Sequence, residues 1–192
     1  LNVKESFFGN IFSDNISKTN VTIESKNFFS PFIEPEFSFL MSKELDISKA
    51  PYKSEEVSKY ILAVLPSIEL VDSRFEDWTS VGVKNLITDN AVHAHWIYGN
   101  EVKNLNLFNF NNHSVDLYIN DKLIEKGNSK NVMNNPINSL TWLINKLAIV
   151  GKTLPKNHYV STGTCTKAIP IYKGDTVKAD FGILGNVYFV YN

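Results

Sequence analysis

The 192-residue sequence has few of the features that mark secreted, membrane-spanning or disulfide-rich proteins. Its one cysteine, Cys165, cannot form a disulfide within the chain, which favours a reducing compartment. The apolar runs are far too short to span a bilayer, and the N-terminus "LNVKESFFGN" lacks the basic and then apolar layout of a signal peptide. We therefore predict a cytoplasmic protein with no membrane role.

The sequence also lacks an excess of charge of either sign. It has 19 Lys and Arg residues against 20 Asp and Glu residues, a formal net charge of −1. Proteins that bind nucleic acid or anionic membranes usually carry a basic surplus. We therefore expect no nucleic-acid partner.

No repeat, low-complexity tract or Pro/Gly-rich linker divides the chain. A hydrophobic content of 43% is sufficient for one well-packed domain. We predict a loop-rich N-terminal segment, residues 1–30, followed by a main domain, residues 31–192. Because the first residue is leucine rather than methionine, residues 1–30 are interpreted as the remnant of a longer N-terminal region.

Strands predominate in the patterns along the chain, which predicts an α+β fold that is mainly β. Residues 115–128, "VDLYINDKLIEKGN", read as a hairpin with its turn at "IND". The other predicted strands are residues 21–25, 32–41, 67–75, 91–102 and several short strands with Gly-containing turns in the tail 158–192.

Two segments have helical signals. Ser54 is a capping residue ahead of an apolar stripe that Pro66 ends, so we predict a helix over residues 54–65; the stripe is Val57, Tyr60, Ile61, Val64 and Leu65. Asn135 and Pro136 favour a second helix start, and Gly151 favours its end.

The stretch "FIEPEFSFLM", residues 32–41, places two acids in an otherwise apolar strand. Side chains alternate along a strand, so Glu34, Glu36 and Ser38 share one face. Burying two like charges is costly unless a cation or a proton lies between them. Two interpretations stay open: a solvated edge strand, which Pro35 favours, or a cation or substrate site.

Glu69 is a third acid within an apolar strand pattern, "SIELVDSRF". Three carboxylates of this kind are a plausible site for a hard cation such as Mg²⁺, which prefers oxygen ligands. The spacing alone is weak evidence, because Glu-x-Glu is a common pattern.

Other polar residues have less specific interpretations. His93 and His95 lie at strand spacing on one face and have the side chains of a metal site, but no third nitrogen or sulfur ligand is evident, so we interpret them as polar-face residues. Cys165 lacks the neighbours of a nucleophile and is interpreted as a buried bystander.

The acids outside the cluster are assigned supporting roles. Asp72 and Arg74 are interpreted as an internal ion pair or as support for the site rather than as primary catalysts. Asp175 is predicted to lie in a turn, and Asp89 with Asn90 to form a hydrogen-bonding corner.

Several motifs occur together in a familiar order: "EPEFSFLM", "IELVDSRFEDW", "ITDNAV", "NPINSLTWLINKLAIVGKTL" and "VSTGTCTKAIPIYKGDTVKADFGILGNVYF". In this order they resemble the 2-keto-4-pentenoate hydratase and 4-oxalocrotonate decarboxylase branch of the fumarylacetoacetate hydrolase superfamily, over nearly the whole chain. The resemblance implies the mixed β-roll of the fumarylacetoacetase C-terminal-like type for residues 31–192.

The resemblance also implies a site. Glu34, Glu36 and Glu69 are expected to bind Mg²⁺ or Mn²⁺, which chelates a 2-oxo acid substrate and stabilises an enolate. The turn of Thr162, Gly163 and Thr164 matches the family segment that approaches the substrate carboxylate. The implied activity is a hydratase of a 2-oxo-4-enoate in aromatic catabolism, with a 4-oxalocrotonate decarboxylase as the alternative.

The sequence departs from the family pattern at three points. The family's lysine-containing segment lies upstream of Leu1, Ser6 and Phe7 stand where the family has a proline and an acid, and Val92 replaces a small hydroxyl residue. These departures favour a second alternative, a catalytically impaired metal-binding relative that acts as a partner of an active hydratase or decarboxylase. The resemblance further implies a homo-oligomer.

Overall fold

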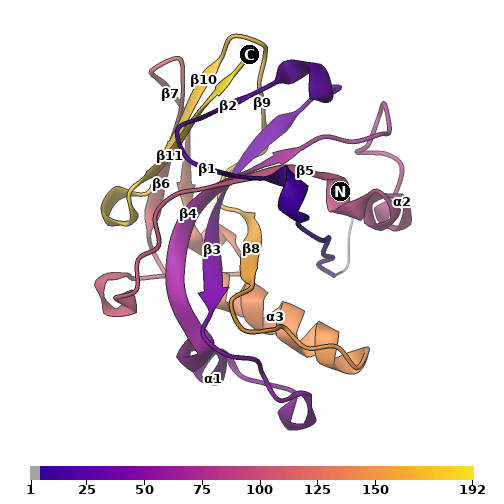
Figure 1. The fold of residues 1–192 in the computed structure, drawn as a ribbon, viewed down its shortest axis with the longest axis vertical. Helices are drawn as coiled ribbons and strands as arrows, with labels where there is room; N and C mark the ends of the chain where they lie inside the picture. The colour runs from indigo at the N-terminus through magenta and orange to yellow at the C-terminus, as the bar shows by residue number, and fades with distance from the viewer. Residues whose placement is uncertain (1–4) are drawn as a thin grey trace.

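The structure, a computed structural model, describes residues 5–192, and its framework consists of two β-sheets with short helices at their ends (Figure 1). The strands are β1 Ile16–Lys18, β2 Val21–Ile23, β3 Phe32–Met41, β4 Ile61–Val71, β5 His93–Tyr98, β6 Ser114–Ile119, β7 Lys122–Asn128, β8 Tyr159–Thr164, β9 Ile169–Pro170, β10 Thr176–Asp180 and β11 Asn186–Tyr191. The α-helices are α1 Ser54–Val57, α2 Val83–Thr88 and α3 Pro136–Ile149.

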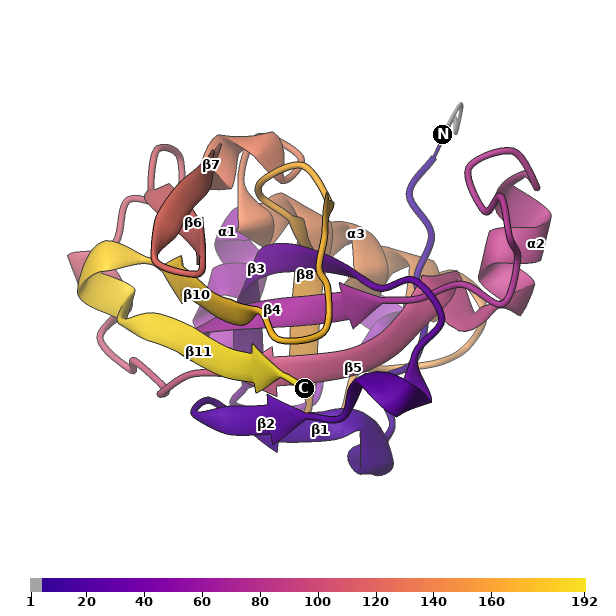
Figure 2. The same cartoon turned by 90° about the horizontal axis from the view of Figure 1, so that it is seen from above.

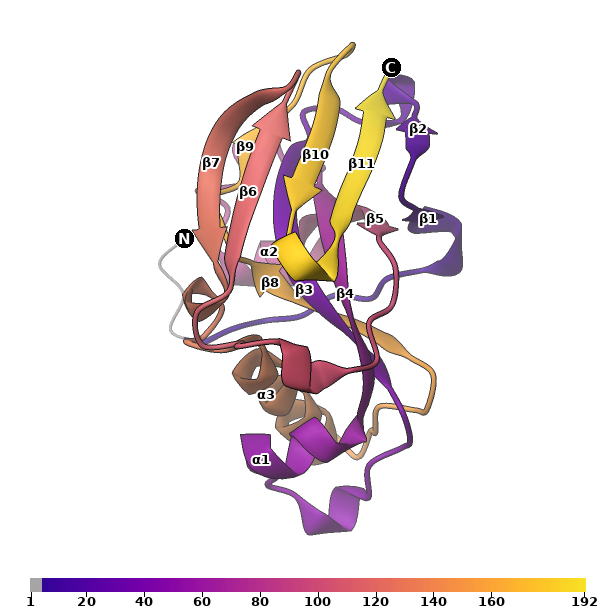
Figure 3. The same cartoon turned by 90° about the vertical axis from the view of Figure 1, so that its left-hand side faces the viewer.

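One sheet has six strands in the order β1-β5-β4-β3-β8, with β9 also paired to β3. The other has five strands in the order β2-β11-β10-β6-β7, which Figure 3 shows side by side. β1 and β2 pair in parallel with β5 and β11, respectively, whereas the other pairs are antiparallel. This arrangement confirms the predicted α+β, mainly β fold with mixed pairing.

The main hydrophobic core is formed by buried side chains from both sheets. Phe37 and Phe39 of β3 and Phe189 of β11 are fully buried in it, as is Phe181, which follows β10. Phe37 and Phe181 meet edge to face with ring centroids 5.2 Å apart. Alternate residues of β3 therefore fix one face of the strand in the core, and Glu34 and Glu36 occupy the other face.

Most of the predicted elements are confirmed. The strand over residues 32–41 has those bounds as β3, and the hairpin is formed by β6 and β7 with Asn120 and Asp121 at positive φ in its turn. Helix α3 begins after Asn135, whose side chain accepts from the backbone N–H of Ile137. Gly151 follows it with φ +69°, a conformation that favours glycine.

The predicted helix over residues 54–65 is wrong beyond its first turns. Only α1 and a 3₁₀ turn, Ser58–Tyr60, are helical, and residues 61–71 form β4, which pairs with β3 along its whole length. Residues 63–68 are all buried, so this part of β4 is covered on both faces. Consecutive residues of such a strand are apolar, and some of them therefore also fall at helical spacing.

Two prolines lie inside this sheet at points where a neighbouring strand is interrupted. The Pro35 carbonyl accepts from the backbone N–H of Cys165, so its ring nitrogen faces the gap between the β3–β9 and β3–β8 pairings. The Pro66 carbonyl accepts from Gly99 N–H, just beyond the end of β5. The interpretation of residues 32–41 as a solvated edge strand is therefore wrong, because β3 is paired on both sides.

The N-terminal segment contributes to both sheets. Seen from above, β1 and β2 lie along one side of the molecule, next to β5 and β11 (Figure 2). The boundary between residues 30 and 31 stays a prediction. In the part of the chain that the structure describes, no helix has the length and apolarity needed to cross a membrane.

Candidate metal centre

Three glutamates from β3 and β4 meet on one face of the six-stranded sheet. Glu34 lies directly opposite Glu69 in the antiparallel register, and Glu36 follows two residues later on the same face. Each of the three has a carboxylate oxygen that lies within 4.8 Å of those of the other two. The strand alternation that suggested a shared face is thus confirmed as geometry, and Glu69 joins the same cluster.

The cluster is electrostatically unfavourable as a set of three charges. Burial, and then the charge of Glu69, raise the pKa of Glu34 to about 8. Burial, followed by the charges of Glu69 and Glu34, raises the pKa of Glu36 well above its usual range. In the absence of a cation, these two carboxyl groups therefore hold protons at pH values where exposed glutamates are ionised.

Hydrogen-bond donors surround the buried carboxylate of Glu36. Ser161 Oγ donates to Glu36 Oε2, and the backbone N–H of Gly163 also donates to this carboxyl group. Ser161 in turn shares a 3.0 Å hydrogen bond with Ser38, and Ser38 shares one of 2.7 Å with Ser67. Ser161 was missed at the level of sequence, where the neighbouring Thr162 was selected instead.

A bulge in β8 explains why Ser161, rather than Thr162, bonds to Glu36. Glu36 pairs with Thr164, but Ser38 pairs with Ser161 rather than with Thr162, so β8 has one extra residue at this point. Gly163 has φ +101° in the bulge. The extra residue places Ser161 on the face of Glu36.

Glu69 has a histidine partner. His93 Nδ1 lies 2.6 Å from Glu69 Oε1, and the His93 side chain is buried. His95 instead pairs with Leu70, and its Nε2 lies 3.0 Å from Ser17 Oγ. Because His93 pairs with Val71, the two histidines oppose adjacent residues of β4, which point to opposite faces. The prediction that they share one face as polar-face residues is therefore wrong.

The triad fits a hard divalent cation. All three donors are carboxylates, the ligand type that Mg²⁺ and Mn²⁺ prefer, and their oxygens lie at a mutual spacing that one ion can bridge. The raised pKa values of Glu34 and Glu36 show that the fold places these carboxylates where a positive charge is lacking. A divalent ion held by Glu34, Glu36 and Glu69 would supply that charge.

The triad opens into a cavity of about 800 Å³. Its walls come from residues 5–11, from β3, β4, β8 and α3, and from the corner at residues 91–93. Large apolar side chains form much of the lining: Phe7, Phe8, Trp78, Val92, Met133, Trp142, Leu143 and Leu147. Among the described residues that line it there is no lysine or arginine.

The predicted substrate-binding turn lines this cavity at all three positions, but its groups are engaged unequally. The Thr162 hydroxyl donates to the Phe37 carbonyl at 2.7 Å, and the Thr162 carbonyl accepts from Ser139 Oγ. The Thr164 hydroxyl makes only long contacts, 3.3 Å to the Thr166 carbonyl. Thr164 is therefore the more available donor of the two.

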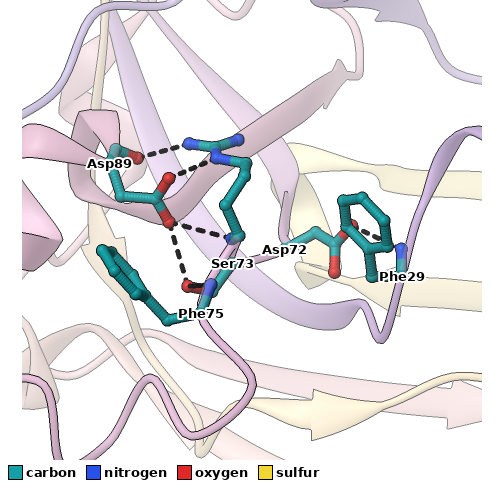
Figure 4. A network of polar contacts seen from close by, with 6 residues as sticks. Phe29, Asp72, Ser73, Phe75 and Asp89 are labelled. Atoms are coloured by element: carbon teal, nitrogen blue, oxygen red, sulfur yellow. Dashed lines mark hydrogen bonds and ion pairs between the residues drawn. The ribbon is translucent and has the colours of Figure 1, made fainter.

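Asp72 and Arg74 support loops and do not pair with one another. The Asp72 carboxylate accepts from the backbone N–H groups of Phe29 and Ser30 at 2.7 and 2.8 Å. Arg74 pairs with Asp89 through its Nε and donates to the Asp89 carbonyl from Nη2 at 2.6 Å. Figure 4 shows the two carboxylates, the bonds made to Asp89 and the bond between Asp72 and Phe29. A mutual ion pair is therefore wrong, and a role in supporting the site stays a prediction, because the bonds of Asp72 and Arg74 go to Phe29, Ser30 and Asp89.

Asp89 and Asn90 form the predicted corner. Asn90 exchanges hydrogen bonds of 2.8 and 2.9 Å with the backbone of Asn10, and a Cβ at Gly9 would lie 2.3 Å from the Asn90 carbonyl oxygen. Asn90, Ala91 and Val92 then follow with φ of +53°, +58° and +58°. The corner thereby holds the N-terminal segment against the cavity rim and turns Val92 into the lining.

Two further predictions are confirmed. Cys165 is fully buried, its Sγ donates to the Pro35 carbonyl, and burial raises the pKa of its thiol, so it has no nucleophilic character. Asp175 lies in a turn and accepts from Tyr172 N–H and from the Asn120 amide.

Known proteins include clear relatives of this chain. The family model described as fumarylacetoacetate (FAA) hydrolase C-terminal matches residues 3–189. The 2-keto-4-pentenoate hydratase 1 of Dechloromonas aromatica (strain RCB) is 24% identical over 187 residues, which cover 97% of this chain and 70% of that protein. The 4-oxalocrotonate decarboxylase of Pseudomonas sp. (strain CF600) is 27% identical over 160 residues, 81% of this chain and 58% of that protein.

A solved structure has the same fold. It is the 4-oxalocrotonate decarboxylase from Pseudomonas putida G7, complexed with magnesium and adipate, and it superposes with a TM-score of 0.90 at 24% sequence identity. The match covers 96% of this chain and 69% of that one. The mixed β-roll is thus shared nearly from end to end of the chain described here.

Proposed function

The chain belongs to the fumarylacetoacetate hydrolase family, and from this premise we propose that it is a divalent-metal-dependent hydratase of a 2-oxo-4-enoate. Relatives named as hydratase and decarboxylase support an enzyme of this family. In the proposal Mg²⁺ or Mn²⁺ is held by Glu34, Glu36 and Glu69. A homo-oligomeric state and a cytoplasmic location stay predictions.

The observation that carries the proposal is the convergence of the three carboxylates, of which Glu36 is fully buried, in the lining of a large cavity. A divalent cation bound there would polarise the keto oxygen of a 2-oxo acid and stabilise negative charge that develops on it. A proton in the same place would neutralise the acids but would bring no such chemistry. The size of the cavity, about 800 Å³, is ample for a small oxo acid.

The protein groups around the cluster have separable roles in this proposal. Ser161 and the Gly163 N–H hold the Glu36 carboxylate in place. Thr164, with its loosely held hydroxyl, is the proposed donor to the substrate carboxylate, whereas Thr162 has its proton committed to the Phe37 carbonyl. The aromatic and aliphatic walls exclude water and contact the alkenyl tail.

The lining favours the hydratase over the alternative, a 4-oxalocrotonate decarboxylase-like enzyme. A dicarboxylate substrate has a second anionic group that must lie away from the metal end. Among the described residues that line the cavity, Glu5 already pairs with Lys146 at 2.6 Å and much of the remaining lining is apolar, so burying a second carboxylate there is costly. A monocarboxylate with an apolar tail meets no such penalty. The decarboxylase stays the second candidate because of the relative of that name.

The test follows the ultraviolet absorbance of 2-hydroxypenta-2,4-dienoate with purified protein and Mg²⁺ or Mn²⁺. We expect a metal-dependent loss of absorbance that EDTA abolishes and that Glu36→Gln lowers by at least about 10²-fold, since one metal ligand is lost. A parallel assay with 4-oxalocrotonate measures carbon dioxide release, and we expect its kcat/KM to be lower by about tenfold or more.

Each result decides between the candidates. Faster turnover of 4-oxalocrotonate would overturn the hydratase in favour of the decarboxylase. If a folded, metal-loaded protein leaves both substrates unchanged, the enzyme proposal fails. The impaired metal-binding relative would then be the better description, in line with Phe7 and Val92 in the cavity where the family has an acid and a hydroxyl group.

A further inference from the structure

We propose that His93 is a positioning residue that fixes the carboxylate of Glu69 for metal binding. The inference rests on the proposed metal site. It assigns to this imidazole the task of donating one hydrogen bond through Nδ1 to Glu69 Oε1, 2.6 Å away. A carboxylate that is restrained in this way presents its remaining lone pairs to the ion in one orientation.

The first support for the proposal is the register between β4 and β5. Trp96 pairs with Glu69 and His95 with Leu70, so a regular ladder would place Ala94 opposite Val71. The register shift after Leu70 places His93 there instead. The bulge therefore brings the imidazole onto the face of Glu69, where regular pairing would have put a methyl group.

The second support is the incomplete bonding of the ring. The His93 residue is 4% exposed, and its Nε2 has no hydrogen-bond partner among the described residues. A buried polar atom without a partner costs free energy, and an apolar side chain of similar shape would avoid that cost. Among the described residues, the Nδ1 contact to Glu69 is thus the one polar interaction that distinguishes histidine from leucine at this position.

The proposal requires one tautomer of His93, in which Nδ1 is the donor to Glu69. An ionised carboxylate only accepts hydrogen bonds, so Nδ1 carries the hydrogen. In a neutral ring Nε2 is then a bare acceptor, and no buried N–H is left without a partner. The geometry resembles the arrangement in which an outer group orients a metal-binding carboxylate, where loss of the group typically costs about 10–100-fold in metal affinity.

The test compares three substitutions in the full chain by Mn²⁺ titration, with electron paramagnetic resonance as the readout. His93→Leu removes the donor but fills the space, which matters because His93 also lines a second cavity of about 550 Å³. His93→Asn keeps an N–H donor near the position of Nδ1, whereas His93→Gln moves it to the position of Nε2. His95→Leu is the matched control on the same strand.

We expect the Mn²⁺ dissociation constant to rise about 10–100-fold in His93→Leu and His93→Gln and to stay within about threefold of the parent value in His93→Asn and His95→Leu. A role in packing alone would not separate Asn from Gln. Circular dichroism and thermal unfolding identify the variants that fold. Equal affinities in all the folded variants, or an equal loss in Asn and Gln, would overturn the inference.

A second measurement does not depend on metal. The chain has four histidines, so the side-chain ¹H–¹⁵N correlations of the metal-free protein are few enough to assign, with His93→Asn as reference. We expect His93 to be protonated at Nδ1, with a proton that Glu69→Leu shifts or exposes to exchange. An Nε2-protonated ring would overturn the inference. If the parent protein has this signature but binds no Mn²⁺, the metal site fails while the His93–Glu69 contact stands.

Discussion

The acidic side chains of the cavity carry an electrostatic cost in the absence of a cation. Glu36 is buried beside two other carboxylates, and the donors Ser161 and Gly163 offset only part of the burial. The pKa of this acid is raised on folding, so there is a pH range in which the unfolded chain has Glu36 ionised while the folded, metal-free chain retains a proton there. Proton uptake from dilute solution disfavours folding, so the acids of the site lower the stability of the metal-free protein.

This cost predicts the effect of Glu36→Gln on unfolding. In EDTA at pH 8 we expect the variant to have a Tm about 2–4 °C higher than the parent, which corresponds to about 1 kcal/mol for a protein of this size. The amide keeps the shape and accepts from Ser161, but it has no proton to acquire. Added Mg²⁺ should raise the Tm of the parent and leave that of the variant nearly unchanged. Differential scanning calorimetry measures both shifts.

Glu44→Gln is the control, since Glu44 is exposed and lies outside the cluster. Its Tm should match the parent within about 1 °C in EDTA, as is usual for a surface substitution, and the Mg²⁺ shift should be retained. A metal-free Glu36→Gln protein that unfolds below the parent would contradict the argument that burial of this acid is costly.

The side chains of the site were predictable from sequence only where strands are regular. Alternation along residues 32–41 placed Glu34 and Glu36 on one face, and Glu69 was found by the same pattern. Ser161 was not found, and His93 was interpreted only as a polar-face residue, because each reaches the acids through a bulge. One extra residue inverts which side chain faces the cluster, and no local pattern in the sequence marks that residue.

The strands and helices differ in how far local signals determined them. Helix α3 has a capping Asn135, a proline at its first position and Gly151 after its end, and these signals depend on no distant partner. Residues 61–66 lack such signals. Their apolar pattern suits either a buried helix or a buried strand, and pairing with β3 decides the outcome.

The cap of α3 is a testable local contribution to stability. The Asn135 side chain accepts from Ile137 N–H at 2.9 Å and donates to Asn111 at 2.9 Å. We expect Asn135→Ala to lower the free energy of unfolding by about 1 kcal/mol, within a range of about 0.5–2 kcal/mol, because a helix N-terminal N–H loses its partner. Urea unfolding followed by circular dichroism measures the change.

Asn104→Ala provides the comparison for this cap. Asn104 also precedes a helical turn, Leu105–Leu107, but its side chain makes no capping hydrogen bond. Its replacement should therefore change stability by less than about 0.5 kcal/mol. Equal losses in the two variants would show that the Asn135 bond does not account for the effect.

The molecule as a whole assembles the cavity from segments far apart in the sequence. Residues 5–11, two central strands, β8 and α3 all line it, and the Asn10–Asn90 bonds link positions 80 residues apart. The periodicity of the sequence does not predict which of these distant segments meet. The resemblance of ordered motifs predicted it, because a shared fold brings the same motifs together. The N-terminal segment, predicted as mainly loop, also supplies β1 and β2 to the two sheets.

Metal binding by the whole protein should release protons. A bound ion needs ionised carboxylates, and the pKa of Glu34 is raised to about 8, so below that pH the ion must displace at least one proton. We expect the Mg²⁺ dissociation constant to fall by about tenfold per pH unit from pH 6 to pH 8, or more steeply if Glu36 also gives up a proton. Isothermal titration calorimetry in buffers of different ionisation enthalpy counts the protons directly.

The same linkage fixes the sign of the effect on the metal-free fold. Glu34 has a higher pKa folded than unfolded, so its favourable contribution is full below about pH 4.5 and is lost as the pH rises towards 8. Metal-free protein should therefore lose stability over the range in which metal affinity increases, and saturating Mg²⁺ should flatten or reverse the trend. Glu34→Gln should reduce the pH dependence of both the Mg²⁺ dissociation constant and the stability of the metal-free protein. A pH-independent dissociation constant with no proton release would show that these acids are already ionised without the ion, contrary to the burial and mutual repulsion seen at the site.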